Sequence, residues 1–171
     1  MNLDNLPSIE DAQAIITSAE KWCDENGGYL EWHIPSGRGC LWLSLNKDWG
    51  LKIFYREGWG SGSDGTMRNA IDAYDAGIGP YVHGMKHMVK LGEKMCPCFF
   101  MQRVPVILED EYDYNFEYDD DSNTDYYNAE DVQEFVEYCK EFGFYDLIPA
   151  NLGLLDGCLV MVDSSHRRFY Y

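Results

Sequence analysis

Apolar residues recur at helical spacing in three stretches of the chain, and glycines follow each stretch. The first stretch follows Ser8, and Asp11 completes a capping-box pattern in which aspartate replaces the usual glutamate. The glycine pair 27–28 is expected to end this helix. The three helices are expected at about 9–26, 66–76 and 129–141.

Short apolar runs bounded by turn residues predict β-strands between these helices. The expected strands cover 29–34, 40–45, 49–55, 81–89 and 96–106, with turns at 35–39, 46–48 and 90–94. A segment rich in Gly and Ser, 57–65, is expected to form a loop. A last apolar strand follows the turn 155–157 and ends at Asp163. Strands and helices together indicate an α+β fold.

The charge balance narrows the classes of partner. Asp and Glu number 30 against 13 Lys and Arg, a formal net charge of −17. Nucleic-acid binders concentrate Lys and Arg, so direct nucleic-acid binding is not expected. The charge favours a basic protein partner, or no partner and simply high solubility. The sequence contains no apolar run of about 18 residues, so no membrane span is expected. The N-terminus does not resemble a signal segment, which predicts a cytoplasmic protein.

The six cysteines are scattered along the chain, mostly in apolar contexts. This distribution indicates reduced thiols in the core rather than a disulfide framework. Acidic residues and tyrosines dominate 109–131, a composition that buries little surface and repels itself. This run is interpreted as a solvated linker, with a functional acidic surface as the alternative.

Four polar residues stand out against their surroundings. Lys52 lies inside an otherwise apolar strand, where an ammonium needs a partner or an anionic ligand to offset its desolvation. The alternative is a lysine whose stem lies on the strand while its ammonium reaches water. Asp146 and Asn151 lie either side of a Leu-x-Pro loop, and Asp163 follows the last strand. Asp and Asn also favour ordinary turns, which is the alternative for that pair.

The pattern Asp146-Leu147-x-x-x-Asn151, then a strand ending in Asp163, resembles the catalytic loop and metal-binding acid of the protein-kinase-like superfamily. The local sequence is similar to those of small bacterial and phage-encoded kinase-like proteins and of the aminoglycoside-phosphotransferase branch. The resemblance implies a kinase-like small lobe, an antiparallel sheet plus a helix, with an abbreviated helical large lobe. The implied divisions are an N-terminal helix (1–28), a small lobe (29–108), an acidic linker (109–128) and a large-lobe remnant (129–171).

The resemblance also implies a role for each motif residue in binding ATP and Mg²⁺. Lys52 would contact the α- and β-phosphates, and the metal ligands would be Asn151 and Asp163. Asp146 would orient or deprotonate the acceptor hydroxyl. The remaining implied nucleotide-binding residues are Gly37 and Gly39 over the phosphates, and Gln102 and Arg103 near the hinge that contacts adenine.

The sequence departs from the family pattern at several places. Phe144-Tyr145 replaces the His-Arg that precedes the catalytic acid, and Ser164-Ser165 follows Asp163. Trp42 stands where the third glycine of the phosphate loop would fall. A glutamate to pair with Lys52 is not evident, and Asp72 is the nearest acid on the second helix.

These departures, and the few residues after Asp163, leave two functions open. One is a kinase-like protein that binds Mg-ATP and phosphorylates a protein or itself. The other is a catalytically inactive kinase-like effector that inhibits a host protein through its acidic surface, in the host cytoplasm if it is phage-encoded. A homodimer in which a second chain completes the nucleotide site is a further alternative.

Overall fold

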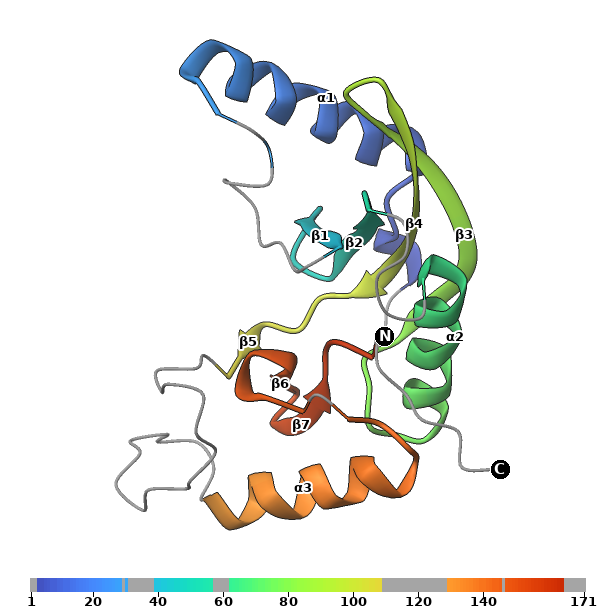
Figure 1. The fold of residues 1–171 in the computed structure, drawn as a ribbon, viewed down its shortest axis with the longest axis vertical. Coiled ribbons are helices and arrows are strands. Elements are labelled where there is room, and N and C mark those ends of the chain that lie inside the picture. The colour runs from blue at the N-terminus through green and yellow to red at the C-terminus, as the bar shows by residue number, and fades with distance from the viewer. Residues whose placement is uncertain are drawn as a thin grey trace.

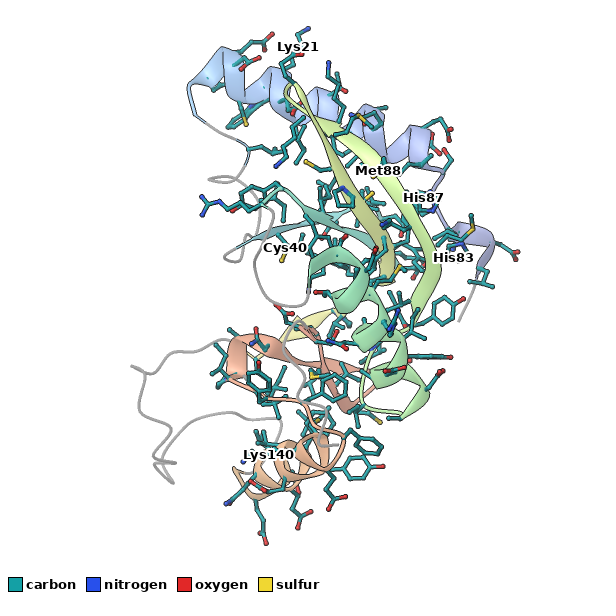
Figure 2. The ribbon with its side chains drawn as sticks, turned by 45° about the vertical axis from the view of Figure 1, so that its right-hand side comes forward. Lys21, Cys40, His83, His87, Met88 and Lys140 are labelled. Atoms are coloured by element: carbon teal, nitrogen blue, oxygen red, sulfur yellow. The ribbon has the colours of Figure 1, made fainter. Side chains whose placement is uncertain are left out.

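The computed structural model describes residues 3–28, 30, 39–56, 62–108, 129–145 and 147–164. Over these ranges the chain is an α+β protein, as the sequence predicted. Figure 1 shows helix α1 (Ile9–Asn26) near one end of the molecule and helix α3 (Ala129–Glu141) at the other, with two sheets between them. Lys21 on α1 and Lys140 on α3 mark the two ends in Figure 2.

The larger sheet is antiparallel, with strand order β1-β2-β4-β3. Its strands are β1 (Cys40–Ser44), β2 (Trp49–Phe54), β3 (Val82–Leu91) and β4 (Lys94–Gln102). Lys52 on β2 lies opposite Trp42 on β1 and Phe99 on β4. Directly paired side chains point to the same face, so these three residues share one face of the sheet.

Helix α1 covers the opposite face. Its N-terminus carries the predicted capping box: the Ser8 hydroxyl accepts the Asp11 N–H at 3.0 Å, and the Asp11 carboxylate accepts the Ser8 N–H at 3.3 Å. Ala12 and Ile16 of this helix are fully buried. They pack against the strand residues Leu41, Leu43, Trp49, Leu51, Ile53, Val89, Cys96, Cys98 and Phe100. This cluster is the main core of the larger sheet.

Helix α2 (Gly62–Asp75) covers the face that carries Lys52. Ala70 of α2 packs with Val82, Phe99 and Met101 of the sheet. The expected loop 57–65 is wrong for 62–65, which form the first turn of this helix. An acid, Asp64, lies in that turn, where a carboxylate favours the helix N-terminus.

The second sheet has three strands in the order β5-β6-β7. They are β5 (Val106–Ile107), β6 (Leu152–Leu155) and β7 (Cys158–Met161), and a short 3-10 helix, η3 (Pro149–Asn151), leads into β6. Its core contains Val136, Cys139, Phe144, Leu147, Leu152 and Met161, together with Ala73 and Ile78. Because Ala73 belongs to α2, this helix packs on both sheets.

Two strand boundaries differ from the sequence prediction. The turn expected over 90–94 is only Gly92 and Glu93, because Leu91 already pairs with Lys94. The single strand expected over 96–106 ends at Gln102 and resumes as β5 in the other sheet. Pro105 separates the two pieces, and proline cannot donate a backbone hydrogen bond to a ladder.

Several predicted features lie outside the described residues. They are the strand 29–34 apart from Leu30, Gly37, the acidic linker 109–128, Asp146 and the tail from 165. Within the described part of the chain, no helix is both long and apolar enough to span a membrane.

Candidate functional site

Lys52 and Asp163 form an ion pair between the two halves of the chain. The Lys52 Nζ donates to Asp163 Oδ1 at 3.0 Å, although 111 positions separate the two residues. Strand β2 holds the lysine, and the segment after β7 holds the acid. Two of the residues that the sequence singled out are therefore brought into direct contact.

The surroundings of this pair have opposing effects on the pKa of Lys52. Burial is the largest single influence and lowers the pKa of Lys52, but the charge and hydrogen bond of Asp163, together with Cys40, outweigh it, so the pKa lies above its ordinary value of 10.5. Cys40, on the neighbouring strand β1 (Figure 2), also raises this pKa. The lysine therefore stays charged inside the protein.

The backbone around Asp163 is anchored on both sides. Before it, the Met161 N–H donates to the Ile78 carbonyl at 2.7 Å, and the Val162 N–H donates to the Asn151 carbonyl at 2.8 Å. After it, the buried Ser164 accepts through its carbonyl. The position of the carboxylate is therefore set by contacts from several elements.

Asn151 lies beside this segment. It ends η3, its N–H donates to the Ile148 carbonyl at 2.8 Å, and its carbonyl holds Val162. The two predicted metal ligands, Asn151 and Asp163, thus belong to adjacent backbone segments. Asp146, the predicted acid of the same loop, lies outside the described residues.

The face beside Lys52 carries an aromatic side chain. The Trp42 indole lies directly over Gly50, since a Cβ built on that glycine would come within 2.2 Å of the ring. Gly50 lies two positions before Lys52 on the same strand, so the indole covers the face of the sheet that carries Lys52. Of the two glycines predicted to cover phosphates, Gly39 is described: it precedes β1, and its carbonyl accepts the N–H groups of Tyr55 and Arg56.

Gln102 and Arg103 lie where the chain leaves the larger sheet. The Gln102 N–H donates to Tyr81 and its side chain accepts the Tyr81 N–H, while the Arg103 N–H donates to Asp48. Their backbone donors are therefore already used within the protein. A cavity of about 260 Å³ lies at this junction, and its lining is Lys47, Asp48, Gln102, Arg103, Pro105, Leu155 and Asp156. Lys52 and Asp163 do not line it.

Asn69 on α2 is the residue that sequence reasoning missed. Its Nδ2 donates to the Ser164 carbonyl at 3.1 Å, and both residues are buried. The expected contributor from this helix was Asp72, as an acid for Lys52, whereas the ion pair is made with Asp163. A polar residue on the apolar face of a helix is a signal that can be found in sequence, although its partner cannot.

The residues fit a metal that arrives with phosphates. Mg²⁺ is commonly held by one or two carboxylates plus substrate phosphates. Among the described residues, no group of three or more His, Cys, Asp and Glu side chains could hold a metal. Asp163 and Asn151 are the residues that would hold Mg²⁺ together with substrate phosphates.

Comparison with protein-family models, with curated proteins and with solved structures finds no match for this chain.

Proposed function

We propose that this chain is a kinase-like protein that binds Mg-ATP at the site formed by Lys52 and Asp163. The observation that carries the proposal is the 3.0 Å ion pair between a buried strand lysine and an acid at the end of a hairpin. Two segments far apart in sequence supply a cation and a carboxylate to one place. That combination suits a nucleotide polyphosphate with its metal.

The element order supports the same proposal. The lysine strand is followed by a helix on its own face, three further strands, a helix, a loop with Asn151, and a hairpin after which Asp163 follows. The resemblance to kinase-like proteins implies this order apart from β5 and β6, which are additional strands. The function rests on the site itself, because one fold hosts many activities.

Each residue has a distinct proposed task. Lys52 binds phosphate oxygens with its ammonium, and its raised pKa keeps it charged. Asp163 and Asn151 hold the metal, which neutralises phosphate charge when bound. Asp146 orients the acceptor hydroxyl of a protein substrate or of the chain itself.

A thermal melt with and without Mg-ATP tests this function. At about 100 times the Kd, a ligand that binds only the folded state stabilises it by about 2.7 kcal/mol. We expect this stabilisation in the wild type and its loss in Asp163→Asn and Lys52→Met. Lys21→Met is the matched control, because Lys21 is an exposed lysine on α1. A wild-type melt that Mg-ATP leaves unchanged would reject the proposal, and phosphate transfer from labelled ATP separates turnover from binding.

Helix α3 supports a second candidate, the binding of a basic partner without turnover. Its exposed acids are Glu130, Asp131, Glu134, Glu137 and Glu141. Reversing three of them to lysine tests this candidate with a basic protein such as histone or lysozyme as probe. Binding that is unchanged by the reversal and by added salt contradicts an acidic docking surface.

A further inference from the structure

Helix α2 reaches the Asp163 segment through one buried hydrogen bond. The side-chain Nδ2 of Asn69 donates to the backbone carbonyl of Ser164 at 3.1 Å. Asn69 is 3% exposed and Ser164 is 4% exposed, so water does not compete for this bond. A buried amide without a partner is costly, which makes this contact a constraint on where the two segments lie.

Ser164 follows Asp163 directly, so fixing its carbonyl restricts the backbone torsions that aim the Asp163 side chain. The other side is already held, because Val162 donates to Asn151. With both flanks fixed, the carboxylate is held where it accepts from Lys52. Asn69 supplies one of these two flanking contacts.

The helix that carries Asn69 is itself tied to both sheets. Its first turn is bound to β3 by the ion pair of Asp64 with Lys86, at 2.6 Å. Its last turns place Ala73 in the core of the second sheet. A displacement of α2 would therefore be transmitted to Ser164 through Asn69.

We propose that Asn69 is a positioning residue that couples α2 to Asp163 and so sets the strength of the Lys52–Asp163 pair. This rests on the proposed function only where nucleotide binding is concerned. The coupling to Lys52 is a property of the protein alone and has its own readout.

The readout is the reactivity of Lys52 toward an amine-acylating reagent, measured by mass spectrometry on the full chain without nucleotide. An ammonium held by its carboxylate partner is acylated slowly, so loosening the Lys52–Asp163 pair speeds the reaction. Asn69→Ala and Asn69→Asp both remove the donor, and Asp163→Asn removes the partner outright. We expect faster Lys52 labelling in all three, and the fastest in Asp163→Asn.

Thr66→Val is the matched control, because Thr66 is a buried polar residue one turn earlier on the same helix. Its labelling should equal that of the wild type. Wild-type labelling in both Asn69 variants overturns the proposal, as does labelling in Thr66→Val that matches theirs. A Lys52 labelling rate in Asp163→Asn equal to that of the wild type also overturns the proposal, because the ion pair would then not protect Lys52.

Should the Asn69 variants fail to fold, the wild type and Asp163→Asn still decide the question. The side-chain amide of Asn69 is observable by NMR, and its resonance should shift in Asp163→Asn if the two residues are coupled. A resonance that does not move contradicts the coupling.

Nucleotide binding provides a second test of the positioning role, and this test rests on the proposed function. Asn69→Asp should raise the Mg²⁺ concentration needed for ATP-dependent stabilisation, while Thr66→Val leaves it unchanged. If Mg-ATP does not stabilise the wild-type protein, the proposed function fails. Lys52 labelling and the Asn69 resonance still test the positioning role in that case.

Discussion

The Lys52 side chain is 7% exposed, whereas the Asp163 side chain that it contacts at 3.0 Å is 32% exposed. Lys52 has therefore lost more of its hydration than Asp163. If the pair is broken, the carboxylate can recover water and the ammonium cannot. This asymmetry determines which substitution lowers the free energy of unfolding more.

Asp163→Asn should destabilise the fold more than Lys52→Met. The first leaves a buried ammonium without its anion, and breaking a buried pair in this way costs about 3–5 kcal/mol. The second removes the buried charge and places an apolar chain of similar length on the face that carries Trp42 and the buried Phe99. Urea unfolding of the two variants and the wild type measures the difference.

The double variant, with both substitutions, is the control for this comparison. It should recover most of the stability lost in Asp163→Asn, because no buried charge remains. Equal losses in the two single variants would show that the lysine finds water or another anion in the folded state.

The pH dependence of stability follows from the raised pKa of Lys52. A group whose pKa is higher in the folded state stabilises the fold fully below its unfolded value and loses this contribution as pH rises through the folded value. The stability difference between wild type and Lys52→Met should stay constant up to the ordinary value of 10.5 and fall above it. Using the difference cancels the tyrosines that titrate in both proteins. A difference that already declines below 10.5 would mean that burial outweighs Asp163.

The sequence predicted the members of this site better than their contacts. Lys52 stood out because a charge inside an apolar strand needs an explanation, and the resemblance named Asp163. Nothing in local periodicity pairs residues 111 positions apart. Asn69 was missed because its partner is a backbone carbonyl, which any residue possesses.

Errors in the predicted fold arose where tertiary contacts override local signals. Strand β6 was not predicted, since Asn151 and Gly153 mark a turn by composition. Its ladder with β5 and β7 forms only when distant segments meet. Likewise, the glycine- and serine-rich residues 62–65 join α2, where Asp64 pairs with Lys86 of the adjacent strand.

Thiol reactivity should separate the cysteines by burial. Burial raises the pKa of Cys98 and of Cys139 to about 12, so both stay protonated and unreactive in the native state. Cys158 is exposed and should react first with a disulfide reagent. Cys158→Ser should remove the fast phase, and denaturant should release all six thiols. Rapid native reaction of Cys98 or Cys139 would show that their cores open readily.

Gly50→Ala should disturb the face beside Lys52 without changing any charge. The added Cβ would meet the Trp42 ring at 2.2 Å, so the indole must move, and overpacking of this kind typically costs about 1–3 kcal/mol. The tryptophan emission should shift, and Mg-ATP stabilisation should change if the indole borders the nucleotide. Gly84→Ala is the matched control, because its added Cβ would meet only Ile71 at 4.0 Å. Equal effects of the two substitutions would mean that loss of a strand glycine, rather than displacement of Trp42, is responsible.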